Sequence, residues 1–305
     1  MLFLNYRNEA DIYESDLALF QSPNWLNDHC LNFYFRWLQH DFSTSRSLDN
    51  LVASLKTLSI SSASKSNPTV TEERFTVPVE RLGLHEFSSD HLLNVSSTGE
   101  KLLDETVLLL DPSIVSFFML QCNDEEDFTD LEKNIQTRKR DLIFIPITNR
   151  NSINDTSTHW SLLVLLRYES GYKFFHYDSH GAYNRSASIE VAQKFLNLLC
   201  SSSSQATFSS SMASTKGINE VGKNLTIHQD SSSPQQSNSY DCGMYVCCIT
   251  RLLLVAYLTC PKDALNLFDN YLKQAVTQDF ISEERIHIKQ YADDIFYKSA
   301  TEVEI

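Results

Sequence analysis

Residues 234–247 read PQQSNSYDCGMYVC, and they place a cysteine where a polar loop gives way to a long apolar segment. The apolar content from Gly243 to Leu258 predicts a buried helix with Cys242 at its front. A thiol at the N-terminus of a helix lies beside partial positive charge, which favours the thiolate. The stretch therefore predicts a core helix and, at its first turn, a reactive cysteine.

Two further polar residues stand at the ends of apolar runs. WSLLVLL (160–166) follows His159, and YKFFHYD (172–178) ends on Asp178. The two runs are separated by Glu169, Ser170 and Gly171 and indicate a hairpin. Because antiparallel strands around a turn are neighbours, the hairpin is expected to hold His159 close to Asp178.

These residues supply what a cysteine protease needs. Cys242 would be the nucleophile, His159 its proton partner, and Asp178 the acceptor that orients the imidazole. Gln236, six residues before the cysteine, would offer an N–H to the tetrahedral oxyanion, together with the backbone N–H of Cys242. Gly243, which lacks a Cβ, is expected to let the substrate backbone come close.

Each of the four residues also has a simpler interpretation. Cys242 alone would be a buried core thiol, and His159 alone a structural or surface histidine. Asp178 precedes Ser-His-Gly and could serve only the turn, while Gln236 in its polar loop carries no information by itself. Their joint order and the elements that they terminate favour the catalytic interpretation.

The rest of the pattern predicts a mixed α+β domain with strands flanked by helices. An aspartate followed by proline, at Asp111–Pro112, is typical of a helix start. By periodicity we expect helices at 28–39, from 112 onward, at 187–199 and at 243–258, and strands at 142–147, 160–166, 172–178 and 225–228.

Composition favours one large domain over the whole of 1–305, since 42% of the 305 residues are apolar. Serine-rich stretches at about 43–71 and 200–233 are expected to be surface insertions, partly disordered, because they offer little to bury. Within the first, Leu48, Leu51, Val52 and Leu55 could form a helical turn.

Charge and cysteine content exclude several classes of protein. A net charge of −14 without a basic stripe argues against nucleic acid as a partner. The seven cysteines are odd in number and lack a C-x-x-C pair, so neither a disulfide framework nor a metal site is expected, and no cofactor is indicated. The apolar runs are too short for a membrane span and the start lacks a signal sequence, which predicts a protein of the cytoplasm or nucleus.

Four blocks of this sequence resemble the Ulp/sentrin-specific family of cysteine proteases, which cleave ubiquitin-like modifiers. They are WLNDHCLNFYFRWL (25–38), THWSLLVLL (158–166), FFHYDSHG (174–181) and PQQSNSYDCGMYVC (234–247). The pieces WLNDH, FFHYDS and NSYDCGMYV are most similar to the deneddylase branch. His159 and Asp178 are 19 residues apart, about two more than in the family, and the extra length falls at the predicted turn.

The resemblance implies a papain-like fold of the Ulp type, with a central mixed sheet and the catalytic cysteine at a helix N-terminus. It implies His159, Asp178 and Cys242 as the triad and Gln236 as the oxyanion-hole residue. Trp25 and Trp160 would enclose a narrow tunnel for a Gly-Gly terminus, and Asn27 and Asp28 would contact the extended tail. Trp25 could instead be a packing residue, and Asp28 could merely cap its helix.

The expected function is cleavage after the terminal Gly-Gly of a ubiquitin-like modifier. The branch implies the neddylation modifier, its cullin-type conjugates and possibly its precursor as substrates. A protease directed at SUMO is the alternative within the same class. From other classes, a non-catalytic module that binds ubiquitin-like proteins and an acyltransferase that uses the same thiol remain open.

Overall fold

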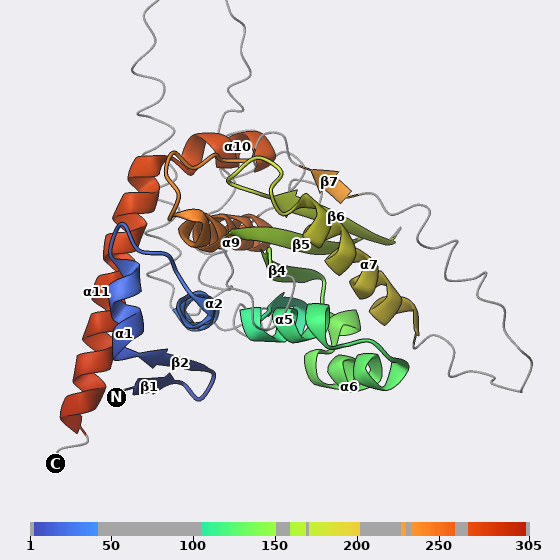
Figure 1. The fold of residues 1–305 in the computed structure, drawn as a ribbon, viewed down its shortest axis with the longest axis horizontal. Coiled ribbons are helices and arrows are strands. Elements are labelled where there is room, and N and C mark those ends of the chain that lie inside the picture. The colour runs from blue at the N-terminus through green and yellow to red at the C-terminus, as the bar shows by residue number, and fades with distance from the viewer. Residues whose placement is uncertain are drawn as a thin grey trace, which may run out of the picture.

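A computed structural model gives the structure of the protein (Figure 1), and it describes residues 3–41, 105–150, 159–168, 171–201, 227–229, 233–259 and 268–302. The first predicted insertion, with its apolar pattern from Leu48 to Leu55, and most of the second lie outside the described residues.

The centre of the fold is a five-stranded mixed sheet with the order β3-β4-β5-β6-β7. The two outer pairs, β3 with β4 and β6 with β7, are parallel, and the two inner pairs are antiparallel. The strands are β3 (Val107–Leu109), β4 (Leu142–Thr148), β5 (Trp160–Tyr168), β6 (Gly171–Tyr177) and β7 (Ile227–Gln229).

Helices cover both faces of this sheet, and a small hairpin lies near the N-terminus (Figure 1). The helices are α1 (Glu14–Leu17), α2 (Asp28–Asp41), α5 (Pro112–Leu120), α6 (Glu125–Ile135), α7 (Arg185–Ser201), α9 (Cys242–Thr259), α10 (Phe268–Ala275) and α11 (Gln278–Glu302), with short 3-10 turns at Ala18–Phe20 and Thr137–Lys139. The hairpin pairs β1 (Phe3–Tyr6) with β2 (Ala10–Tyr13).

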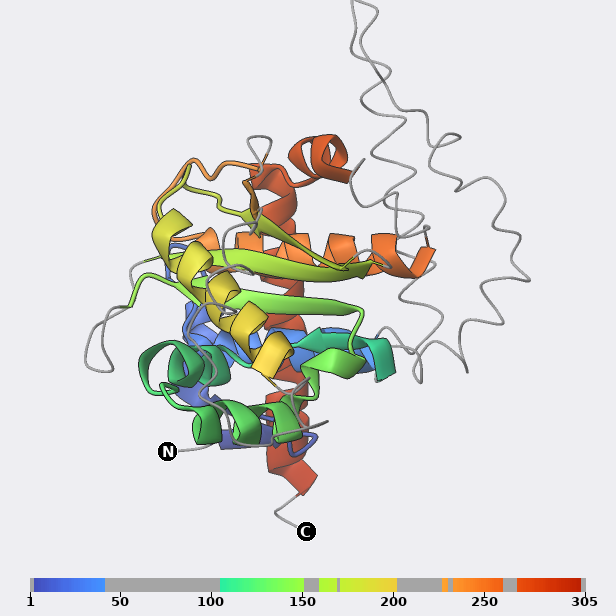
Figure 2. The same ribbon diagram turned by 90° about the vertical axis from the view of Figure 1, so that its right-hand side faces the viewer.

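The sheet separates two hydrophobic cores. Leu162, Val164 and Leu166 of β5 pack into the core built with α2, α9 and α11. Leu163 and Leu165 point to the opposite side, into the core built with α5, α6 and α7. Figure 2 shows α7 crossing one face of the strands and α9 running along the other. Burial on both faces explains why β5 reads as a continuous apolar run instead of an alternating one.

The helices and strands predicted within the described residues are present, and their bounds differ from the expected ones by at most two residues. The predicted start of α5 is confirmed, because Asp111 Oδ1 accepts a 2.7 Å hydrogen bond from Ser113 N and Pro112 is the first helical residue. The predicted helix behind Cys242 is α9. Among the described residues, no helix has both the length and the apolar content of a membrane span.

Candidate active site

The β5–β6 hairpin brings the predicted histidine and aspartate together. His159 immediately precedes β5, and Asp178 immediately follows β6. Leu162 pairs with Tyr177 across the ladder, so both side chains emerge at the same end of the sheet. His159 Nε2 lies 2.6 Å from Asp178 Oδ1, and both residues are buried. The expectation that the hairpin holds the two side chains close is confirmed.

The Asp178 carboxylate is held by the turn that follows it. Its Oδ1 accepts the backbone N–H of His180, and its Oδ2 accepts the backbone N–H of Asn184, each at 2.9 Å. Burial alone would raise the pKa of Asp178, but the hydrogen bonds from His159 and from these two backbone groups outweigh burial and lower it. The side chain is therefore an anion when it faces the imidazole.

His159 lies between this carboxylate and the thiol of Cys242. Burial alone would lower the pKa of His159, but its hydrogen bonds to Asp178 and Cys242 and the charges of both groups raise the pKa to about 9. Because Nε2 is bonded to Asp178, the other ring nitrogen, Nδ1, is the one that serves Cys242. At neutral pH this geometry favours a protonated imidazole beside the sulfur.

Cys242 is the first residue of α9, where the backbone N–H groups have no acceptor within the helix. The thiol is buried, with 1% of the residue exposed. A Cβ on the next residue, Gly243, would lie 3.0 Å from Leu26 Cβ and 3.2 Å from Leu31 Cδ1. The expected reason for this glycine was wrong: the missing Cβ makes room for the segment that leads into α2, within the same chain.

Gln236 lies in the loop before α9 and is fixed against the Asp178 turn. Its backbone N–H donates to Ser179 O at 2.9 Å, and its Oε1 accepts the Ser179 hydroxyl at 2.6 Å. Its Nε2 donates to Asn238 O at 2.6 Å. Because the amide oxygen is held by Ser179 and one N–H by Asn238, the orientation of the amide group is fixed.

Two residues that support the site were not anticipated. Gln235 Nε2 donates to Asp178 O at 2.9 Å, while its Oε1 accepts Gly181 N at 2.8 Å. The buried Asn184 uses its side-chain amide to reach the carbonyl of His159 at 3.3 Å, in addition to the backbone bond to Asp178. Asn184 thus joins His159 before β5 to Asp178 after β6. In the sequence, only its position shortly after the FFHYDS block could have indicated this supporting role.

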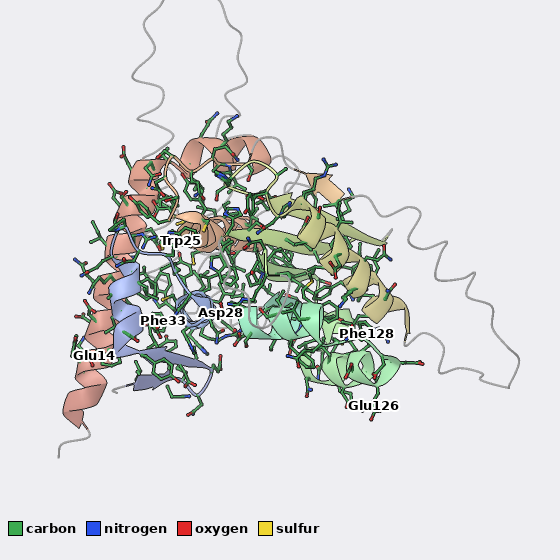
Figure 3. The ribbon with its side chains drawn as sticks, in the orientation of Figure 1. Glu14, Trp25, Asp28, Phe33, Glu126 and Phe128 are labelled. Carbon is green, nitrogen blue, oxygen red and sulfur yellow. The ribbon has the colours of Figure 1, made fainter. Side chains whose placement is uncertain are left out.

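Of the predicted substrate-binding residues, Trp25, Asn27 and Asp28 lie where the chain passes from the 3-10 turn at 18–20 into α2, and Trp160 is the first residue of β5. Trp25 is 39% exposed, whereas Trp160 is 3% exposed. Trp160 Nε1 donates to Leu26 O at 3.0 Å, so the buried indole of Trp160 fixes the backbone next to Trp25. Figure 3 shows Trp25 and Asp28 on this segment. The alternative that Trp25 is simply a core packing residue is disfavoured by its exposure.

Asn27 and Asp28 differ from each other in what they contact. Asn27 Oδ1 accepts Cys30 N at 3.0 Å, and its Nδ2 donates to Asp16 at 2.8 Å, so Asn27 caps α2. The alternative that Asp28 caps the helix is therefore wrong. Asp28 lies 3.7 Å from Arg150 Nη1, and burial, opposed mainly by Arg150, raises the pKa of its carboxyl.

The structure describes the side chains of five cysteines, all of them buried thiols outside any disulfide: Cys30, Cys122, Cys242, Cys247 and Cys248. Burial raises the pKa values of Cys30, Cys247 and Cys248, which makes these core thiols poor nucleophiles. The thiol of Cys242 is the one that interacts with His159. Within the described residues, no cluster of three or more His, Cys, Asp or Glu side chains is arranged to hold a metal ion.

Comparisons with known proteins show the family of this chain. Residues 107–280 match the family described as "Ulp1 protease family, C-terminal catalytic domain". The chain is 26% identical to "Probable sentrin-specific protease 8" of Dictyostelium discoideum over 94% of its own length and 95% of that protein. It is 26% identical to "NEDD8-specific protease 1" of Arabidopsis thaliana over 48% of its own length and 56% of that protein.

A solved structure shares the fold. It is described as "Crystal structure of the de-sumoylating protease", and it superposes with a TM-score of 0.55 at 13% sequence identity over 99% of this chain and 95% of that one. The predicted fold class, an α+β domain of the Ulp type with a mixed sheet, is confirmed by this likeness and by the sheet order.

Proposed function

Because this chain belongs to the Ulp1 protease family and is a cysteine-type protease, we propose that Cys242, His159 and Asp178 are its catalytic triad. Gln236 and the backbone N–H of Cys242 are the donors to the oxyanion. The observation that carries the proposal is the imidazole of His159, which is bonded through Nε2 to Asp178 at 2.6 Å and interacts with Cys242 through its other side.

The chemistry follows from this arrangement. The thiolate of Cys242 attacks the carbonyl carbon of the terminal glycine, a C–S bond forms, and the electron pair moves to the carbonyl oxygen, where the two N–H donors stabilise it. The oxyanion collapses, His159 gives its proton to the leaving nitrogen, and the C–N bond breaks. Water then attacks the thioester while His159 takes a proton from it, and C–S cleavage releases the carboxylate and the thiol.

The substrate that we propose is the Gly-Gly terminus of a ubiquitin-like modifier. Trp25 is exposed, and its neighbour Leu26 lies against Gly243 at the start of α9 and accepts the indole N–H of Trp160. The two tryptophans would close over two residues without side chains and exclude any Cβ by shape. Asp28, which already pairs with an arginine of its own chain, is chemically suited to an arginine that precedes the glycines. The side chain of Asn27 is engaged in the cap of α2, so its contribution to tail binding would come through its backbone.

Among ubiquitin-like modifiers we propose the neddylation modifier, with cullin-type conjugates and possibly the precursor as substrates, acted on in the cytoplasm or nucleus. The support comes from the relatives, one of which is called a NEDD8-specific protease and another a probable sentrin-specific protease 8. The acidic net charge of −14 is compatible with basic protein partners.

The test is a panel of ubiquitin-like modifiers fused through Gly-Gly to one reporter amine, with kcat/KM measured for each. We expect the NEDD8-type fusion to be cleaved fastest and Cys242→Ala to be inactive. A preference for SUMO would overturn the choice of modifier but not the chemistry. A modifier with an electrophilic C-terminus should form an adduct with the wild type only, and a folded wild type that neither cleaves nor forms the adduct would instead be a binding module.

A further inference from the structure

Arg285 of α11 uses all of its donors inside the protein. The residue is 3% exposed, and its guanidinium carries five N–H groups, which make five hydrogen bonds. Nη1 donates to the carbonyl oxygens of Leu19 and Asn24 at 2.9 and 3.1 Å. Nε and Nη2 both donate to Asp241 Oδ1, at 3.0 and 2.8 Å, and Nη2 also reaches Tyr240 O at 3.4 Å.

The two segments that Arg285 joins end next to the two residues that matter most for the proposed reaction. Asn24 directly precedes Trp25, and Asp241 directly precedes Cys242. The backbone on the other side of Trp25 is fixed as well, because Leu26 O accepts the indole N–H of Trp160. Trp25 is therefore exposed as a side chain while the carbonyls before and after it are bound from the interior.

A second, outer contact ties the same two segments together. Ser22 Oγ and Tyr240 Oη are hydrogen-bonded at 3.0 Å, and the Tyr240 ring lies over the Arg285 guanidinium at 5.8 Å from its centroid. Asp241 is also held by Asn238 and Gln278, which each donate to its Oδ2 at 2.7 Å. The junction is a continuous polar network centred on one buried ion pair.

We propose that Arg285 is a positioning residue that sets the width of the slot in which Trp25 and Trp160 would hold the Gly-Gly terminus. It does so by fixing the segment before Trp25, residues 19–24, at one distance from the segment before Cys242, residues 240 and 241. The inference rests on the proposed function. A lysine at this position would keep the charge but present a single nitrogen, which cannot bond to carbonyls of both segments in the planar fork that arginine provides. Arg285→Lys should therefore loosen the slot without removing any group that takes part in the chemistry.

A neighbouring ion pair offers a matched control. Arg251 of α9 pairs with Glu284 of α11 at 2.6 Å, and Tyr34 of α2 donates to the same carboxylate at 2.8 Å. This pair is also buried and also joins helices, but its bonds reach neither the Trp25 segment nor the Cys242 segment. Arg251→Lys should disturb stability in the way that Arg285→Lys does, without changing the slot.

The experiment uses two fusions of one ubiquitin-like modifier to a reporter amine, one in which the modifier ends in Gly-Gly and one in which it ends in Ala-Gly. For each fusion, kcat/KM is measured for the wild type and for Arg285→Lys, Tyr240→Phe and Arg251→Lys. One methyl group in a fitted pocket is worth roughly 10- to 200-fold in discrimination. We expect Arg285→Lys to lose most of that ratio, Tyr240→Phe to lose a smaller part through the outer contact, and Arg251→Lys to keep it. The rate of alkylation of Cys242 by chloroacetamide, which needs no slot, should stay within about twofold of the wild type in the Tyr240→Phe variant, because this change leaves the thiol and imidazole in place.

The outcomes separate the two proposals. If the wild type cleaves neither reporter, the proposed function fails. If it cleaves Gly-Gly but Arg285→Lys and Tyr240→Phe keep its full selectivity, or if Arg251→Lys loses selectivity equally, Arg285 has no positioning role. Should Arg285→Lys fail to fold, Tyr240→Phe decides alone, because its hydroxyl is partly exposed and its loss leaves the buried ion pair intact.

Discussion

Replacing Asp178 by asparagine tests how the imidazole is controlled. The amide keeps one oxygen for His159 Nε2 but places an NH₂ group where Oδ2 now accepts the backbone N–H of Asn184. Two donors would then face each other in a buried site, and leaving a buried donor unpaired costs about 1–3 kcal/mol. The larger effect is the loss of the negative charge beside the protonated ring.

The magnitude follows from the pKa of His159. Its rise from 6.5 to about 9 corresponds to about 3 kcal/mol, which the interactions with Asp178 and Cys242 share. A hydrogen bond to a charged group contributes about 1.5–3 kcal/mol, so we expect kcat/KM at neutral pH to fall roughly 100-fold. The pKa of His159 should drop by at least about one unit.

The assay is the pH dependence of kcat/KM on a Gly-Gly reporter. Above the pKa of His159 the ring has no proton for the leaving amine, so the wild type should lose activity as the pH rises through about 9. In Asp178→Asn this alkaline limb should move to lower pH. An alkaline limb that stays where it is in the wild type, in a variant that is folded by circular dichroism, would refute the assignment of Asp178 as the partner that charges His159.

Four further changes have defined outcomes. Gln236→Ala should lower kcat about 100-fold with little change in KM and no change in alkylation of the thiol, since it removes an oxyanion donor and leaves the thiol and the imidazole in place. An unchanged kcat would exclude that role. Gly243→Ala should destabilise the protein by about 1–3 kcal/mol in urea unfolding, because its Cβ would meet Leu26 at 3.0 Å, and a neutral result would contradict the packing described above. Trp25→Ala should lower kcat/KM for Gly-Gly reporters while the unfolding free energy changes little, since the side chain is 39% exposed; a large loss of stability would point to packing instead. The pKa of His159 is higher in the folded than in the unfolded state, so its stabilising effect is complete below pH 6.5 and is lost as the pH rises toward 9. His159→Gln should flatten that part of the stability profile, and identical slopes for variant and wild type would count against the raised pKa.

The sequence was sufficient for the elements that carry the proposed triad because their signals are local. The runs on either side of residues 169–171 are strongly apolar, and they are bounded at their other ends by the polar residues His159 and Asp178. The helix that begins at Cys242 is likewise indicated by a local signal, the apolar run from Gly243 to Leu258. The register of the hairpin then follows from its short connection, so two distant residues could be placed side by side without coordinates.

What the sequence did not reveal depends on contacts between distant segments. The long helix α11 buries Ile281, Ile288 and Ala292 at helical spacing, but Arg285 occupies the same buried face, and its charge hides the pattern. Its partner Asp241 looked like an ordinary polar residue before the cysteine. Gly243 was interpreted through the substrate because only the fold shows that Leu26 occupies the space beside it.

The β5–β6 hairpin has one more consequence. Seven residue pairs, from Leu162 with Tyr177 to Tyr168 with Gly171, separate the chemistry from the connection at the far end, a span of about 20 Å at 3.3 Å per residue. Additions at that connection lengthen the chain without changing where the imidazole and carboxylate meet. The far end of this hairpin is therefore the natural place to graft an epitope or a fluorophore onto an enzyme that stays fully active.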